Sequence, residues 1–91
     1  MLELNWSDEA LDDLAEIVAY IADRNEGAAR RLRALITEAA DRLPSNPTIY
    51  RPGRIDGTRE VIVHSNYIIV YRVTLTAVDI VAVLHARQQY P

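Results

Sequence analysis

The chain has 91 residues, of which 49% are hydrophobic and 25% are charged, so we expect one globular domain over residues 1–91 and not a disordered or fibrous protein. The absence of cysteine excludes disulfides, thiolate metal sites and a cysteine nucleophile, and it fits a cytoplasmic location. A net charge of −3 argues against a general nucleic-acid-binding protein, and no apolar run approaches the roughly 20 residues of a membrane-spanning helix.

The N-terminal half predicts a strand followed by two helices. Residues 2–6 alternate apolar and polar side chains, as a half-buried strand does, and they lack the basic and apolar regions of a signal peptide. Ser7 is a good N-cap, and apolar residues at spacings of three and four then predict an amphipathic helix over residues 8–24. Residues 25–27 interrupt this pattern before a second helix, predicted over residues 28–43. So short a connection makes the two helices an antiparallel hairpin.

The C-terminal half predicts a loop and then three strands. Prolines and glycines mark residues 48–57 as a loop. Residues 58–64 and 67–73 flank a two-residue turn and predict a β-hairpin, and residues 78–84 predict another strand. The last two strands are nearly continuous apolar runs, as expected of central strands covered on both faces. The order β-α-α-β-β-β predicts an α+β fold, with the helical hairpin packed on a mostly antiparallel four-stranded sheet.

Charge is distributed unevenly along the chain, and all ten basic residues are arginines. Residues 1–48 hold ten acids and five arginines, a net charge of −5, whereas residues 49–91 hold five arginines and three acids, a net charge of +2. The most unusual segment follows the last strand and gathers polar side chains at one end of the sheet. With two arginines of the hairpin strands, it predicts a surface for an anionic or polar partner, made of Arg59, Arg72, His85, Arg87, Gln88, Gln89 and Tyr90.

Ordinary structural roles compete with this interpretation. A histidine at a strand end, such as His85, is more often a hydrogen-bonded structural group than a catalyst. Arg59 and Arg72 can form surface ion pairs with acids such as Glu60, the tyrosines of residues 67–73 favour packing, and the acids of the first helix favour a solvated face. The histidines have no acids or cysteines at ligand spacing and the glycines form no phosphate-binding loop, so we expect neither a metal nor a cofactor.

Three groups of motifs together resemble the ParE branch of the RelE/ParE toxin superfamily over nearly the whole chain. Residues 6–14 and 17–22 read WSDEALDDL and IVAYIA. Residues 50–60 read YRPGRIDGTRE, which is similar to the loop and strand of ParE-like toxins. Residues 66–73 read NYIIVYRV, and residues 83–87 read VLHAR. Each motif alone is weak, but all three in this order and at this length are specific to the superfamily.

The resemblance implies the toxin of a type II toxin–antitoxin pair. Its partner is then a cognate antitoxin, which lays an extended or helical segment across the toxin and silences it. The resemblance also implies that operator DNA is bound by the antitoxin and that the toxin alone binds no specific DNA sequence. It assigns no residue of this chain to antitoxin binding.

The superfamily has two kinds of target. RelE-like members are ribosome-dependent mRNA endonucleases whose pattern includes lysines and an arginine in the penultimate strand, but this chain has no lysine and carries Ile68 at that position. If the chain were such a ribonuclease, His85, Arg87 and Tyr90 would be its catalytic candidates. ParE-like members inhibit DNA gyrase, and the motifs fit this branch better. We therefore expect a non-catalytic gyrase inhibitor, with the mRNA endonuclease and a non-toxic antitoxin-binding module as alternatives.

Overall fold

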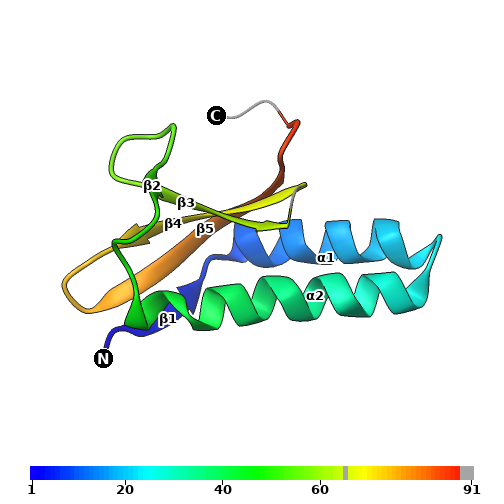
Figure 1. Cartoon of the computed structure of the whole chain (residues 1–91), viewed down its shortest axis with the longest axis horizontal. Helices are drawn as coiled ribbons and strands as arrows, with labels where there is room; N and C mark the ends of the chain where they lie inside the picture. The colour runs from blue at the N-terminus through cyan, green and yellow to red at the C-terminus, as the bar shows by residue number, and fades with distance from the viewer. Residues whose placement is uncertain (65, 89–91) are drawn as a thin grey trace.

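A helical hairpin covers one face of a five-stranded sheet (Figure 1). The computed structural model describes residues 1–64 and 66–88, so Gln89 and Tyr90 of the predicted surface lie outside the described residues. In chain order the elements are β1 (Glu3–Trp6), α1 (Asp8–Ala22), α2 (Glu26–Asp41), a short 3₁₀ helix (Leu43–Ser45), β2 (Arg51–Pro52), β3 (Arg59–His64), β4 (Tyr67–Val73) and β5 (Ala77–His85). This order confirms the predicted α+β fold and adds one strand to it.

Side-chain caps determine where both helices begin. The Ser7 hydroxyl oxygen accepts a hydrogen bond from the Ala10 N–H at 3.0 Å, and the Asn25 amide oxygen accepts one from the Ala28 N–H at 2.9 Å. Each cap satisfies a backbone amide that the first helical turn leaves without a partner. Because Asn25 is the cap, α2 begins at Glu26, two residues before its predicted start. Both helices end two residues earlier than predicted.

The strands lie in the order β1-β5-β4-β3-β2, with β1 parallel to β5 and every other pair antiparallel. β4 and β5 each have a strand on both edges, which confirms that they are central. The prediction of a loop over residues 48–57 is wrong at Arg51–Pro52, which pair with Glu60 and Arg59 as β2. A proline lacks a backbone N–H, so a short edge strand is the part of a sheet that tolerates it.

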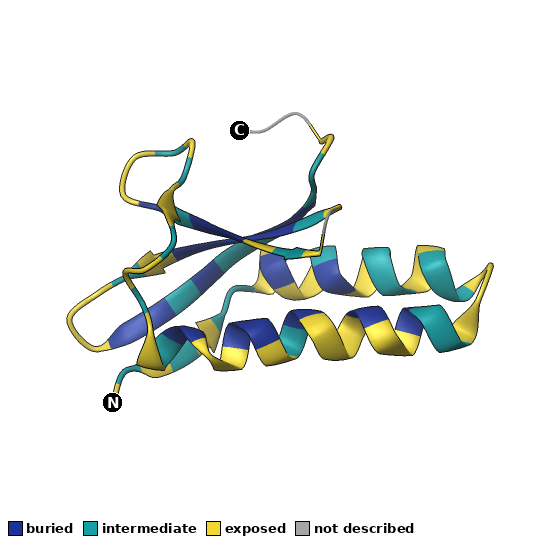
Figure 2. Ribbon diagram, in the orientation of Figure 1, coloured by how far each residue is buried: buried dark blue, intermediate teal, exposed yellow. Residues whose placement is uncertain are grey.

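The main hydrophobic core lies between the sheet and the helical hairpin. Buried positions line the inner side of both helices and the middle of the sheet (Figure 2). Alternate residues of β4 face the helices, so Ile69 and Tyr71 are fully buried there. Ile68 and Val70 face the other side, where they form a second, smaller cluster with Leu84. In the described part of the chain no helix covers that second face (Figure 1).

Tyr71 connects the sheet to the segment that follows α2. Its hydroxyl donates a hydrogen bond to the Pro47 carbonyl at 2.9 Å, which confirms the packing role expected of the tyrosines of this strand. Burial raises the pKa of Tyr71, an effect that Arg59 opposes and Tyr50 reinforces. The hydroxyl is therefore held in its neutral, hydrogen-bonded form, and it fixes the chain where residues 46–50 cross from the helices to the sheet.

Candidate functional site

His85 ends β5 beside the first residue of β4. It pairs in register with Tyr67, and the two rings meet edge to face with their centroids 5.3 Å apart. Beyond His85 the chain turns back on itself, because the Arg87 N–H donates to His85 Nδ1 at 3.1 Å and the Gln88 N–H donates to the His85 carbonyl at 2.9 Å. Arg87 and Gln88 are exposed. This end of the sheet therefore presents a half-buried imidazole beside two exposed polar side chains.

Two polar side chains attach the start of α1 to the edge of β5. β1 pairs with residues 77–80 alone, so within the described chain the rest of that edge has no neighbouring strand. The Ser7 hydroxyl donates to the Val81 carbonyl at 3.3 Å, and the Asp13 carboxylate accepts from the Val83 N–H at 3.0 Å. Asp13 thus departs from the solvated face predicted for the acids of this helix, because it replaces a missing strand partner.

A hollow of about 390 Å³ opens between α1 and the end of the sheet. Its position follows from the Ser7 and Asp13 hydrogen bonds, which keep α1 against the second half of β5. One carboxylate, one aliphatic side chain and three aromatic rings form the lining: Glu16, Ile17, Tyr20, Tyr67 and His85. His85 therefore points to the side of the sheet that carries the helices.

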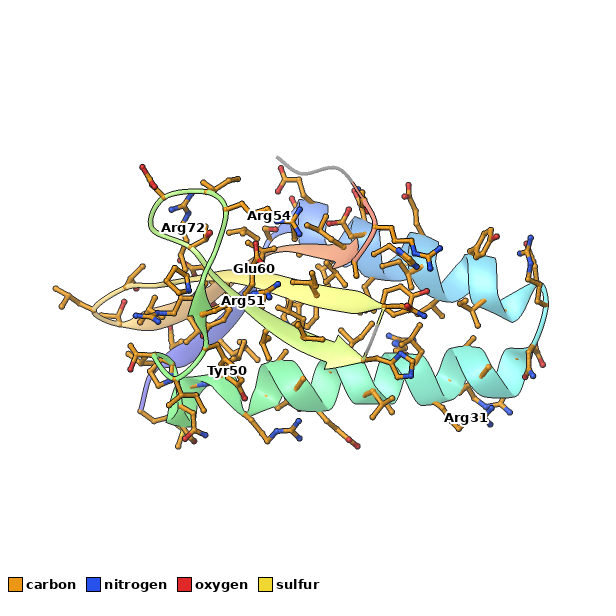
Figure 3. The ribbon with its side chains drawn as sticks, turned by 45° about the horizontal axis from the view of Figure 1, so that its top comes forward. Arg31, Tyr50, Arg51, Arg54, Glu60 and Arg72 are labelled. Atoms are coloured by element: carbon orange, nitrogen blue, oxygen red, sulfur yellow. The ribbon has the colours of Figure 1, made fainter. Side chains whose placement is uncertain are left out.

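A second polar group is formed by β2, β3 and the loop that joins them (Figure 3). Glu60 is only 4% exposed, and the pairing of β2 with β3 places Arg51 beside it on the face without helices. Glu60 Oε1 lies 3.0 Å from Arg51 Nη2, and Oε2 accepts from the Arg54 N–H at 3.2 Å, with Arg54 Nε at 3.8 Å. The buried carboxylate is thus satisfied by both arginines, whose side chains stay about half exposed.

Arg59 and Arg72 donate to backbone carbonyls on either side of β2, Arg59 to the segment before it and Arg72 to the loop after it. Arg59 Nη1 donates to Thr48 at 3.2 Å and Tyr50 at 2.8 Å, and Arg72 Nη1 donates to Asp56 at 3.1 Å. The ion pairs expected around Glu60 therefore form with Arg51 and Arg54, which sequence reasoning did not select.

The predicted site residues do not converge on one place. Arg59 pairs with Tyr71, four residues along β4 from the partner of His85, which is about 13 Å at the usual strand rise. Arg72 follows Tyr71 and so points to the opposite face of the sheet. Of the described residues in the prediction, the structure brings together His85, Arg87 and Gln88, and it places Arg59 and Arg72 at the other end.

Sequence reasoning missed both the Glu60 group and the helix side of the hollow. The two glycines of the loop, Gly53 and Gly57, were the sequence signal for the Glu60 group. The structure shows why both are glycine: a Cβ at Gly53 would lie 2.1 Å from the Thr58 hydroxyl, and Gly57 has a φ of +82°. Such glycines indicate a tight return of the chain and hence a strand before it. Glu16 and Tyr20 carried a signal for the second, because a spacing of four places them on one helix face.

A family model described as the ParE toxin of the type II toxin–antitoxin system parDE matches residues 4–90. The chain belongs to the ParE toxin family. It is therefore the toxin of a type II toxin–antitoxin system, as its motifs predict. None of the helices in residues 1–64 and 66–88 of this ParE-family toxin is long and apolar enough to span a membrane. Those same residues also contain no group of three or more potential metal ligands.

Individual relatives of this ParE-family toxin agree with that assignment. A protein of Sinorhizobium fredii (strain NBRC 101917 / NGR234), named "Putative toxin Y4kP", is 44% identical over 89 residues, which cover 97% of this chain and 92% of the relative. The chromosomal ParDE toxin–antitoxin system of P. aeruginosa contains a chain with a TM-score of 0.84 at 21% identity, covering 93% of this chain and 96% of that one. The YoeB/ParE toxin of Agrobacterium tumefaciens has a TM-score of 0.66 at 15% identity, covering 98% and 100%. These two structures share its fold.

Proposed function

We propose that this toxin stops growth by binding DNA gyrase and blocking replication, and that its cognate antitoxin silences it by binding to it. Membership of the ParE family over residues 4–90 supports the choice of target, together with the ParE-like motifs of residues 50–60. On this proposal the toxin acts by contact and no bond in the target is broken. The exposed residues Arg87 and Gln88, which follow β5, supply part of that contact.

The separation of the polar groups is the observation that carries this proposal. Cleavage of RNA by an acid–base mechanism needs a base within about 3 Å of the ribose hydroxyl and a cation beside the phosphate in the same place. Here His85 lies on the helix side of one sheet end, whereas Arg59 lies about 13 Å along the sheet. Both carboxylate oxygens of Glu60 are engaged by Arg51 and Arg54. Apart from Arg87, whose backbone N–H is hydrogen-bonded to His85, these described groups fit structural and binding roles better than a shared reaction centre.

A ribosome-dependent mRNA endonuclease is the second candidate, because one observation favours it. His85 Nδ1 accepts a hydrogen bond from the backbone N–H of Arg87 at 3.1 Å, so the two residues are neighbours at the C-terminal end of the sheet. An imidazole can transfer a proton and a guanidinium can stabilise phosphate charge. This pair is the place to look if the target is RNA.

Pulse-labelling of DNA and protein synthesis after induction of the toxin without its antitoxin tests the proposal. Gyrase inhibition predicts that incorporation of thymidine falls first and that incorporation of amino acids follows later. A prior collapse of protein synthesis would replace the proposal with the endonuclease. Unchanged growth would contradict both and leave a non-toxic antitoxin-binding module. Co-expression of the antitoxin is the control, since it should restore both labels.

A further inference from the structure

The hollow between α1 and the sheet end has a chemistry that the proposed target contact does not use. Its walls combine the carboxylate of Glu16 with the rings of Tyr20, Tyr67 and His85, over the aliphatic side chain of Ile17. Glu16 is exposed and Tyr20 is 60% exposed, so both can be reached from solvent. The lining contains no lysine or arginine.

Aromatic rings beside a carboxylate favour a cation. The faces of the two tyrosine rings carry negative electrostatic potential, and the carboxylate adds a full charge that orients a guanidinium or an ammonium group. Tyr20 already demonstrates this preference within the chain, because the guanidinium carbon of Arg24 lies 3.9 Å from the centre of its ring. The Arg24 side chain also donates to the Tyr20 carbonyl at 3.0 Å, so this arginine is held by its own turn of helix.

The helix behind the hollow strengthens the preference for positive charge. α1 carries five acids and no basic residue: Asp8, Glu9, Asp12, Asp13 and Glu16. Asp13 is partly used by β5, whereas Glu9, Asp12 and Glu16 are exposed. Charge complementarity therefore selects a basic side chain as the occupant over an acidic or neutral one.

The place of the hollow indicates which partner brings that side chain. His85 belongs both to the lining and to the turn that positions Arg87 and Gln88. In Figure 1 the end of β5 lies over α1, so a chain seated in the hollow runs beside residues 86–88. A protein that binds there covers the segment by which the toxin is proposed to reach its target.

We infer that this hollow is a socket for an arginine or lysine side chain of the cognate antitoxin. The inference rests on the proposed function for the identity of the partner. It adds a binding site and a mechanism of silencing. The antitoxin inserts one basic side chain, its anchor, between Glu16 and the aromatic rings, and the antitoxin backbone then shields residues 86–88. Silencing is in this view a steric consequence of a cation-binding contact on α1.

Isothermal titration of the purified antitoxin into variants of the full-length toxin tests the socket. Glu16→Gln removes the charge of the lining and keeps its shape, and it should weaken binding by about three- to tenfold. Tyr20→Leu removes a ring and should weaken binding by a similar factor. Glu9→Gln is the matched control, because it removes the same charge from the same helix outside the hollow, and it should change the Kd less than about twofold.

A double-mutant cycle identifies the anchor. Each arginine and lysine of the antitoxin is replaced by glutamine, and each replacement is measured against wild-type toxin and against Glu16→Gln. One basic residue should lose its effect when Glu16 is already neutral, since contacting residues are not additive. Thermal unfolding of each toxin variant shows that the fold is intact.

Three results would overturn the socket. The first is an equal loss of antitoxin affinity for Glu16→Gln and Glu9→Gln. The second is that the effect of every basic residue of the antitoxin adds to that of Glu16→Gln. The third is that Glu16→Gln weakens gyrase binding but leaves the Kd for the antitoxin unchanged. Growth arrest by the wild-type toxin in the absence of antitoxin tests the proposed function separately. The proposed function can therefore fail while the comparison of Kd values still decides the socket.

Discussion

Glu60 is a buried charge that the structure keeps by surrounding it with donors. Its two oxygens accept from Arg51 Nη2 and from the Arg54 N–H, and these contacts hold residues 51–57 against β3. A carboxylate is an acceptor at both oxygens, whereas a glutamine of the same size presents an NH₂ group at one of them. That NH₂ group would face another donor. The stability contributed by residue 60 therefore depends on its negative charge and on its two acceptor oxygens, and not on the size of the side chain alone.

Glu60→Gln should accordingly lower the free energy of unfolding by about 1–3 kcal/mol, the usual cost of a buried polar group that loses its partner. Urea denaturation at neutral pH measures this loss. Asp56→Asn is the control, because Asp56 is an exposed acid of the same loop and should change stability by less than about 0.5 kcal/mol. Wild-type stability of Glu60→Gln would mean that the loop does not depend on this carboxylate.

Tyr71 gives the fold a dependence on alkaline pH. Burial, opposed by Arg59 and reinforced by Tyr50, raises the pKa of Tyr71 above its ordinary value of 10.0. The unfolded chain therefore ionises at a lower pH than the folded chain does, so the stability from Tyr71 is complete below about pH 10 and is lost as the pH rises through the folded value. A phenolate can no longer donate to the Pro47 carbonyl, which adds to the loss.

Tyr71→Phe should thus cost about 1 kcal/mol at pH 7, the typical contribution of one hydrogen bond. The difference from the wild type should shrink as the pH is raised above 10, because the wild type then loses the same contribution. Urea denaturation from pH 7 to pH 11 measures both values, with Tyr20→Phe as the exposed control. A difference that stays constant across this range would contradict the assigned role of the buried hydroxyl.

At the scale of elements, periodicity and caps were sufficient to predict the helices, the hairpin and the central strands. β2 could not be predicted, since two residues carry no period and Pro52 argues against a strand. The candidate site was harder to predict, because the register of the strands determines on which face of the sheet a side chain lies. The irregularities between Ile62 and His64 and between Val70 and Tyr71 shift that register without a signal in the sequence. The first irregularity explains why Arg59 and Arg72 lie on opposite faces of the sheet, because it pairs Arg59 with Tyr71 instead of Arg72. His85 lies apart from both for a simpler reason, since it pairs with Tyr67 at the other end of β4.

The segment after β5 is the element on which the proposed target contact depends. Among residues 86–88, Arg87 and Gln88 are exposed and only Ala86 packs against the small cluster of Ile68, Val70 and Leu84. Truncation after His85 should therefore abolish growth arrest while lowering the free energy of unfolding by only about 1 kcal/mol, the size of a typical point mutation. Growth after induction and gyrase supercoiling measure the first effect, and urea denaturation measures the second. A truncated toxin that still stops growth would remove this segment from the mechanism.

At the scale of the whole molecule, size and layering favour stabilisation of the toxin by a partner. A domain of about this length buries only about 60% of the surface of its unfolded chain. One face of its sheet has no helix in residues 1–64 and 66–88, and the net charge of −5 in residues 1–48 concentrates like charges along α1. Repulsion along that helix is relieved when a basic partner is seated beside it. Binding of the antitoxin and stability of the toxin are therefore coupled.

This coupling predicts that the melting temperature of the toxin rises with antitoxin concentration. A partner that binds the native state alone stabilises it by about 2.7 kcal/mol when its free concentration is 100 times the Kd. For a domain of this length, that stabilisation corresponds to an increase of roughly 10–20 °C. Differential scanning calorimetry at several antitoxin concentrations measures the increase, and the Glu16→Gln toxin should need a proportionally higher antitoxin concentration to reach it. A melting temperature that stays constant while the two proteins form a complex would mean that the antitoxin binds the unfolded chain equally well, and silencing would then act through unfolding and not through a covered surface.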